Sequence, residues 1–126
     1  MKHRDVLVET AQASSYKFRL GALVEFEGQI VATGFNKLEP NGWIHTLNSQ
    51  CGTLKNTTHA EIDAILNTPE GLRDGAVLYV LRILKNGQLA LAKPCEICLA
   101  AAESVGIRRI VYTTNEEMPG VIEMGA

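Results

Sequence analysis

The amino-acid sequence predicts a single α/β domain. Segments with helical periodicity alternate along the chain with short apolar, β-branched segments, and this alternation is typical of α/β proteins. The chain has 126 residues, of which 46% are hydrophobic. That length is sufficient for one hydrophobic core and too short for two, so we expect one domain over residues 1–126.

The first half of the chain predicts a helix followed by a pair of strands. Residues 5–15 have helical periodicity, and residues 20–35 are expected to form two strands joined at Glu27-Gly28. Apolar residues are dense on both sides of these strands, as in a sheet covered on both faces. The polar connection over residues 37–58 is longer than most loops in compact domains, which favours a functional or mobile lid. A partly disordered surface segment is the alternative.

The second half predicts two helices and three strands. A helix is expected to begin at Thr58 or His59 and to stop at Thr68-Pro69-Glu70-Gly71. Its buried side is expected to contain Ile62, Ile65 and Leu66. An Asn-Gly turn then indicates a hairpin, and Gly106 is suited to end a helix in the left-handed conformation. The remaining expected elements are a strand over residues 76–84, an antiparallel strand over 89–92, a helix over 95–105 and a strand over 107–113.

Two short motifs contain residues that bind metals. His59-Ala60-Glu61 lies at the start of the helix expected from Thr58 or His59. Pro94-Cys95-Glu96-Ile97-Cys98 lies at the start of the helix expected over residues 95–105. Zinc binds imidazole nitrogen and thiolate sulfur in a tetrahedral shell, and three protein ligands leave a fourth position for water, as in catalytic sites. We therefore predict that His59, Cys95 and Cys98 hold one Zn²⁺ per chain. The combined pattern is the signature of the zinc nucleobase deaminases.

Glu61 is predicted to be the catalytic acid and base. A His and a Glu two positions apart on a helix point in different directions, so both cannot be simple ligands of one ion. Zinc lowers the pKa of a bound water from about 15.7 towards 7, and a nearby carboxylate can take that proton and pass it to a leaving amine. The spacing of Cys95 and Cys98 places both on one face of a first helical turn, where the helix N-terminus favours the thiolate form.

Each motif also has a simpler interpretation. Thr58-His59-Ala60-Glu61 is a capping box, in which Thr58 would cap the helix and Glu61 would reach back to it. Cys95 and Cys98 are compatible with a redox pair or with half of a structural zinc knuckle. The redox interpretation leaves His59 and Glu61 without a role, whereas the deaminase interpretation uses all the residues.

Charge and cysteine content restrict the class of substrate and the compartment. The formal net charge is −2 and no basic run is present, so the electrostatic footprint of a dedicated nucleic-acid binder is missing and small molecules are favoured. Residues 1–5 are charged, with no long apolar run after them, so neither a secretory signal nor a membrane span is expected. Cys51 is left over from the metal site, which suits a reducing compartment. We therefore expect a cytoplasmic protein.

From the strand pair near Leu20 to the strand that ends near Thr113, the chain resembles the cytidine and deoxycytidylate deaminase superfamily. The resemblance implies a three-layer α/β/α sandwich with a central mixed sheet of about five strands. It also implies that the two ligand-bearing helices pack side by side, with their N-termini aimed at one zinc ion. A homo-oligomer is the usual state in this superfamily, and we expect one here.

The resemblance also implies substrate contacts. Gly34-Phe35-Asn36-Lys37 resembles the Gly-Tyr-Asn segment of nucleotide deaminases, which implies that Asn36 binds the substrate's sugar; a strand-end Asn that satisfies a turn is the alternative. Backbone groups near Ala60 would read the edge of the base. Tyr112 would be a stacking neighbour, although a ring at a strand end is more often part of the core.

Two features depart from the family pattern. Lys37 stands where many deoxycytidylate deaminases have Gly, in a segment that also binds a regulatory triphosphate, so such regulation is not implied; contact with a phosphate is the alternative for Lys37. The tail over residues 114–126 is short for the final helix and strand of the family, unless Val121-Ile122 forms a short edge strand. Oligomerisation would cover that edge.

The expected reaction is hydrolytic deamination of a cytosine nucleotide or nucleoside, with deoxycytidylate as first choice, to give a uracil-type product and ammonia. Deamination of cytosine or adenine in single-stranded nucleic acid is the alternative within the enzyme class. A non-catalytic, zinc-stabilised binding module is the alternative outside it, because a fold can outlive its function.

Overall fold

The computed structural model describes residues 1–16, 18–37 and 58–124. Its strands are β1 (Arg19–Phe26), β2 (Gln29–Phe35), β3 (Val77–Ile83), β4 (Leu89–Ala90), β5 (Arg109–Tyr112) and β6 (Gly120–Glu123). Its helices are α1 (Arg4–Gln12), α3 (Ala60–Asn67), the short 3₁₀ helix η1 (Glu70–Leu72) and α4 (Glu96–Val105). None of these helices is long and apolar enough to cross a membrane.

The strands form one mixed sheet. Its order is β2-β1-β3-β5-β6, and the two-residue strand β4 pairs with the end of β3. The strands β3 and β5 run parallel and are joined through α4, whereas the other pairs are antiparallel. A parallel pair needs a long crossover connection of this kind. The expected mixed sheet of about five strands is confirmed, with β4 as a short addition.

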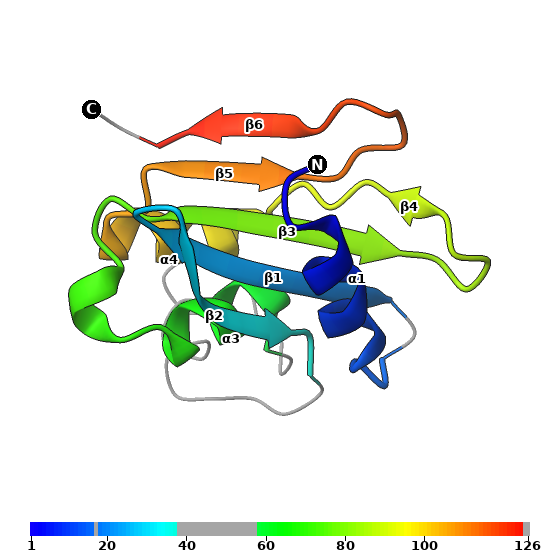
Figure 1. Cartoon of the computed structure of the whole chain (residues 1–126), viewed down its shortest axis with the longest axis horizontal. Helices are drawn as coiled ribbons and strands as arrows, with labels where there is room; N and C mark the ends of the chain where they lie inside the picture. Colours follow the sequence, from blue (N-terminus) through cyan, green and yellow to red (C-terminus); the bar gives the residue numbers. More distant parts are fainter. Residues whose placement is uncertain (17, 38–57, 125–126) are drawn as a thin grey trace.

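Helices cover the sheet on both faces, as Figure 1 shows: α1 lies on one face, and α3 and α4 lie on the other. The alternation of side chains along β1 and β3 supplies a core to each face. Under α1, Leu7 packs with Leu23 and Leu81. On the opposite face, Ile65 of α3 packs with Leu78 of β3. The three-layer α/β/α sandwich implied by the resemblance is therefore confirmed.

Two glycines allow helices to rest directly on the sheet. A Cβ atom at Gly34 in β2 would lie 2.2 Å from the backbone nitrogen of Ala64 in α3. A Cβ atom at Gly21 in β1 would lie 2.6 Å from the carbonyl oxygen of Leu7 in α1. Both distances are far below van der Waals contact, so only glycine permits this approach. The end of β2 thereby fixes the position of α3 and of the residues at its start.

The turns agree with the sequence predictions. Glu27 and Gly28 join β1 to β2 with φ values of 51° and 82°, which is the left-handed backbone of a tight hairpin turn. Gly106 ends α4 with φ 85°. The strands β3, β4 and β5 are shorter than predicted by one or two residues at an end, whereas β1 begins one residue earlier than predicted, at Arg19. The short edge strand that the sequence left open at Val121-Ile122 is present, because β6 contains both residues and pairs antiparallel with β5.

The start of α3 differs from the capping-box interpretation, which is wrong. The N-cap residue is His59, and its side chain forms no capping hydrogen bond. Thr58 instead forms a two-bond bridge with Lys37: the Lys37 N–H donates to the Thr58 carbonyl at 2.9 Å, and the Thr58 N–H donates to the Lys37 carbonyl at 3.0 Å. This pairing holds Thr58 in extended backbone, outside the helix. The predicted lid between these residues lies outside the described part of the chain.

The predicted buried side of α3 is correct for Ile62 and Ile65 and wrong for Leu66. Ile62 and Ile65 are fully buried, whereas 41% of Leu66 is exposed. The helix lies over the edge strand β2, and no described element covers the outer flank of its last turn.

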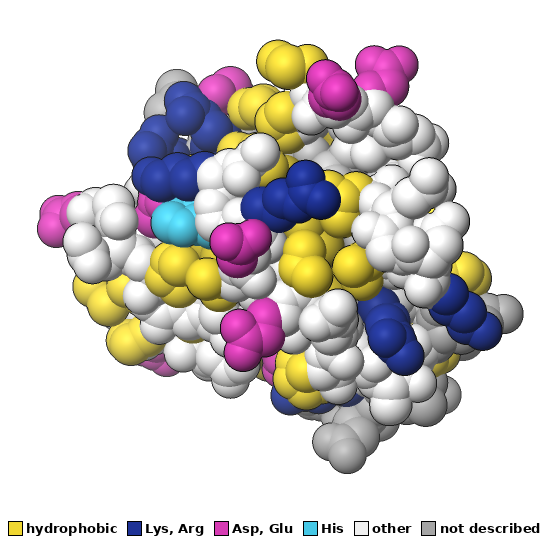
Figure 2. Space-filling model, turned by 45° about the vertical axis from the view of Figure 1, so that its right-hand side comes forward, with side chains coloured by type: hydrophobic (Ala, Val, Ile, Leu, Met, Phe, Trp, Pro, Cys, Tyr) yellow, Lys and Arg dark blue, Asp and Glu magenta, His cyan; other side chains and the backbone are white. Residues whose placement is uncertain are grey.

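The surface carries mixed charge. On the face drawn in Figure 2, Lys and Arg side chains lie in several separate groups, with acidic and apolar side chains between them. This distribution agrees with the formal net charge of −2.

Candidate metal centre

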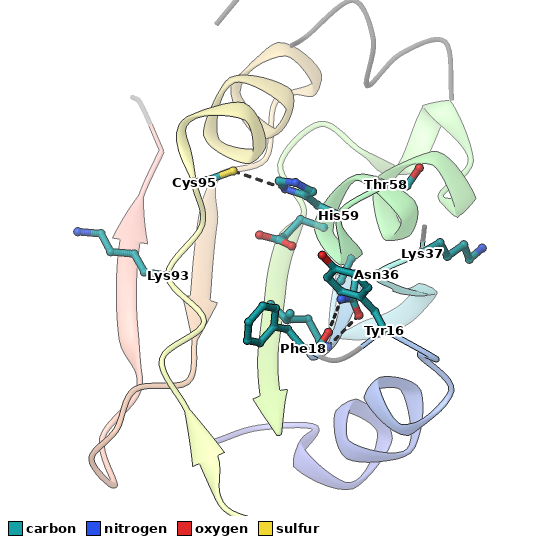
Figure 3. Close-up of a pocket in the computed structure, with 11 residues that line it drawn as sticks. Tyr16, Phe18, Asn36, Lys37, Thr58, His59, Lys93 and Cys95 are labelled. Atoms are coloured by element: carbon teal, nitrogen blue, oxygen red, sulfur yellow. Dashed lines mark hydrogen bonds between the residues drawn. The ribbon is translucent and has the colours of Figure 1, made fainter. Parts of the chain in front are cut away.

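The N-termini of α3 and α4 bring the three predicted ligands together. His59 is the N-cap residue of α3, Cys95 is the N-cap residue of α4, and Cys98 lies in the first turn of α4. His59 Nδ1 lies 3.2 Å from Cys98 Sγ and 3.5 Å from Cys95 Sγ, and the two sulfur atoms are 3.9 Å apart. Figure 3 shows Cys95 and His59 pointing toward each other across the two helix starts.

This triangle of donor atoms fits zinc. A tetrahedral ion with zinc–ligand distances of about 2.0–2.3 Å separates its ligand atoms by roughly 3.5–3.8 Å. The measured separations are close to this range, and all three donor atoms lie within 4.8 Å of one another. One nitrogen and two sulfur donors are also the ligand types that zinc prefers.

The two thiols are electrostatically different. The hydrogen bond with the Cys98 sulfur, assisted by His59 and opposed by burial, lowers the pKa of Cys95 to about 3. The same hydrogen bond and full burial raise the pKa of Cys98 well above its ordinary value. This low pKa favours the thiolate form of Cys95 in the metal-free site. Because metal ligands must be deprotonated, binding of a divalent ion would release the proton that Cys98 keeps.

Glu61 lies beside the donor triangle. It is the second residue of α3, and only 4% of it is exposed. Burial raises the pKa of the Glu61 carboxyl, although its own backbone N–H and the neighbouring His59 oppose that shift. A carboxyl group whose pKa is raised towards neutrality is able to both accept and donate a proton at working pH.

A cavity of about 570 Å³ opens at this centre. Its floor is formed by His59, Glu61 and Cys95, and Ala60 lines it at the start of α3. Ala60 is the first residue of the helix, where backbone N–H groups have no partner within the helix. The volume is within the usual range of about 300–1,000 Å³ for small-molecule sites.

Aromatic residues that the sequence did not indicate form another wall. Tyr16 and Phe18 precede β1 and line the cavity, with Asn36 beside them at the end of β2 (Figure 3). Their rings meet edge to face, with centroids 6.0 Å apart. Two aromatic residues at this spacing before a strand form no motif, so only the fold places them at the site.

Two lysines line the cavity with their charged ends directed elsewhere. Figure 3 shows the Lys37 and Lys93 side chains pointing away from His59. Lys37 Nζ pairs with Asp63 Oδ1 at 3.1 Å and lies 4.8 Å from the centre of the Phe35 ring.

Tyr112 is the one predicted site residue that the fold does not bring to the centre. It is absent from the described lining of the cavity, and a Cβ atom at Gly120 would lie 2.1 Å from its ring. Its ring therefore covers Gly120 of the paired strand β6, as aromatic rings often do beside a strand glycine.

Comparisons with known proteins give a consistent family and fold. Residues 1–114 match the family model described as the cytidine and deoxycytidylate deaminase zinc-binding region. No curated protein sequence matches the chain.

Solved structures with a similar fold include two deaminases. The dCMP deaminase of the cyanophage S-TIM5 in apo form is 22% identical, with a TM-score of 0.60, over 87% of this chain and 78% of that one. In complex with dCMP and dUMP, the same enzyme gives 24% identity and a TM-score of 0.59, over 86% and 75% of the two chains. The cytidine deaminase of Burkholderia pseudomallei is 20% identical, with a TM-score of 0.62, over 98% of this chain and 93% of that one. At these identities the similarity is evidence for the fold.

Proposed function

We propose, from the premise that the chain belongs to the cytidine and deoxycytidylate deaminase family, that it is a zinc-dependent hydrolase that deaminates cytosine in a small nucleotide or nucleoside. The observation that carries this proposal is the grouping of one imidazole and two cysteine sulfurs beside a buried carboxyl group. His59, Glu61 and Cys95 line one cavity, and Cys98 is buried beside Cys95. These are the parts that hydrolysis of an aromatic amine needs.

His59, Cys95 and Cys98 would hold the zinc ion. When bound, zinc acidifies water and so supplies a nucleophile at neutral pH. The low pKa of Cys95 prepares one ligand in advance, and the helix N-termini favour the negative charge of both thiolates.

Glu61 would move the protons. Its carboxylate would accept a proton from the attacking water and pass it to the ring nitrogen. It would then take the second proton, from the new hydroxyl group at C4, and pass it to the departing amine. The C4–N bond breaks, ammonia leaves, and a carbonyl replaces the amino group at C4. Burial of Glu61 supports both halves of this cycle because it brings the proton affinity of the carboxyl group closer to that of its partners.

The start of α3 would orient the base. Ala60 lines the cavity next to Glu61, and a backbone N–H of the first helical turn would be suited to the polar edge of a pyrimidine. Asn36 also lines the cavity, so the expected contact with the substrate stays a prediction.

The site favours a small substrate. Its volume suits a nucleoside or a nucleoside monophosphate. The separated basic groups on the face in Figure 2 differ from the continuous basic groove of a nucleic-acid enzyme. The similar structures act on dCMP and cytidine by their descriptions, and we place deoxycytidylate first. The single-domain organisation, a homo-oligomer and a cytoplasmic location stay predictions.

The test is ammonia release and product mass with zinc-verified protein. The panel is cytosine, deoxycytidine, deoxycytidine 5′-monophosphate, the matching adenine compounds and short single-stranded DNA. We expect turnover of a cytosine nucleoside or nucleotide with weak salt dependence. Turnover confined to the single strand, with steep salt dependence, would move the substrate to nucleic acid. Silence across the panel with zinc bound would contradict the enzyme and favour a binding module.

A further inference from the structure

The aromatic wall of the cavity lies in an irregular segment that needs support from elsewhere. Tyr16 and Phe18 belong to neither α1 nor β1. Phe18 is 44% exposed, and the Arg82 guanidinium lies 4.9 Å from the centre of its ring. An exposed irregular segment has few buried contacts of its own, so its position depends on hydrogen bonds from neighbouring elements.

Asn36 supplies those hydrogen bonds. Its side-chain Oδ1 accepts the Leu20 N–H at 3.0 Å, and its side-chain Nδ2 donates to the Phe18 carbonyl. Its backbone N–H donates to the Leu20 carbonyl at 3.3 Å. Its carbonyl accepts the Ser14 hydroxyl at 2.9 Å, and the same Ser14 oxygen accepts the Tyr16 N–H at 3.2 Å. Figure 3 draws the hydrogen bonds between the Asn36 side chain and the segment at Phe18 as dashed lines.

The burial of Asn36 makes these bonds strong constraints. Only 8% of Asn36 is exposed. A hydrogen bond in such surroundings is costly to leave unmade, because water cannot replace the lost partner. Breaking one of these bonds would therefore release the Phe18 backbone or reshape the strand end.

We infer that Asn36 is a positioning residue, which acts on the substrate through Tyr16 and Phe18 by fixing the aromatic wall against which a planar base would stack. The inference rests on the proposed function and deepens it. It differs from a direct sugar contact, because both polar atoms of the amide are already bonded to the wall segment. Each atom keeps one further hydrogen-bonding position, so the two roles are separated by experiment.

The first measurement needs no substrate. Backbone hydrogen exchange at Leu20 is compared in zinc-loaded wild type, Asn36→Ala and Asn67→Ala. Asn67 is a matched control, since its side-chain Nδ2 donates to the Thr33 carbonyl at 2.9 Å, at the far end of α3 from the cavity. We expect faster exchange at Leu20 in Asn36→Ala alone. Unchanged exchange in that variant would overturn the inference.

The second measurement separates KM from kcat. In Asn36→Ala we expect a KM increase of roughly tenfold, the loss that follows when stacking on a base is weakened, with a smaller change in kcat. The factor should be the same for cytosine, deoxycytidine and deoxycytidine 5′-monophosphate wherever these are turned over. Asn36→Asp keeps the acceptor for Leu20 and loses the donor to Phe18, so an intermediate effect is expected. Asn67→Ala should leave KM unchanged.

A double-variant cycle completes the test. If Asn36 acts through the wall, Asn36→Ala should add little to the KM increase already caused by Phe18→Ala. Additive effects, or a KM increase confined to substrates that carry a sugar, would instead establish a direct contact and overturn the inference. Absence of turnover in zinc-loaded wild type would refute the proposed function, and hydrogen exchange alone would then decide the positioning role.

Discussion

The helices on the two faces of the sheet begin in the same way and have different consequences. α1, α3 and α4 have His3, His59 and Cys95 as N-cap residues, and none of these side chains forms a capping hydrogen bond. On the α3 and α4 face, two such residues converge above a buried carboxyl group. On the α1 face, no second helix start of the described residues lies beside His3, and the His3 ring pairs with Glu25.

This difference shows that helix starts with metal-binding N-cap side chains form a candidate metal site only when two of them lie close together. When the side chain of an N-cap residue forms no hydrogen bond with its own helix, that side chain can bind another group, such as a metal ion. One such residue forms an ion pair, as His3 does. Two of them, together with Cys98 one turn further along, make a donor triangle. The crossover through α4 between β3 and β5 is what brings the second helix start to the first.

The largest expected effect distinguishes the two buried glutamates, Glu61 and Glu25, which lie on opposite faces of the sheet. Glu61→Gln should lower kcat/KM by roughly 10²–10⁴, because the amide cannot carry a proton between water and amine. Zinc content should stay at the wild-type level, since Glu61 is not among the three donors. The matched control is Glu25→Gln, which alters the other buried Glu, 7% exposed, on the α1 face. Its kcat/KM should be close to wild type; an equal loss in both variants would contradict the assignment.

The next effect concerns metal binding. Cys98→Ala removes one of the three proposed zinc ligands and the hydrogen-bond partner of Cys95, so the purified protein should hold less than one zinc per chain. Its activity should fall with its zinc content. The measurement is metal analysis together with turnover after dialysis against a chelator. Full zinc occupancy in Cys98→Ala would show that the donor triangle is assigned wrongly.

A pair of glycine substitutions compares the two helical layers directly. Gly34→Ala and Gly21→Ala should each lower the free energy of unfolding by about 1–3 kcal/mol, because each Cβ meets backbone of a helix that must move. Only Gly34→Ala should also reduce zinc occupancy, since the helix it displaces is α3. Urea unfolding and metal analysis of both variants check this. Equal zinc loss in the two variants would mean that zinc occupancy depends on the overall stability of the fold and not on the position of α3.

The sequence was sufficient for the parts of the site that require particular residue types. His59, Cys95 and Cys98 were identifiable because few side chains bind zinc, and their helices begin with recognisable signals. The aromatic wall was not identifiable, because Tyr16 and Phe18 reach the cavity through the pairing of β1 with β3, which is distant in sequence.

The capping box failed for a related reason. The local pattern at Thr58 and Glu61 was satisfied, yet pairing of Thr58 with Lys37 and burial of Glu61 decided the outcome. Tyr112 followed its alternative interpretation, since its ring lies against Gly120. Local propensity predicts elements well, whereas the residues that line a cavity depend on which elements become neighbours.

The smallest expected effect is on the pH dependence of stability, and it arises from Glu25 on the α1 face. Burial alone would raise the pKa of Glu25, but hydrogen bonds from His3 and Lys2 outweigh it, and the pKa is lowered below its ordinary value of 4.5. A lowered folded-state pKa contributes stability that is present above pH 4.5 and is lost as the pH falls through the folded value. Wild type should therefore lose more unfolding free energy than Glu25→Gln when urea unfolding at about pH 6 is compared with about pH 3. Parallel losses in the two proteins would show that this cluster contributes nothing to acid sensitivity. The comparison is made on metal-free protein, so that zinc binding contributes to neither free energy of unfolding. The effect is expected there because Glu25 lies on the α1 face, away from the donor triangle.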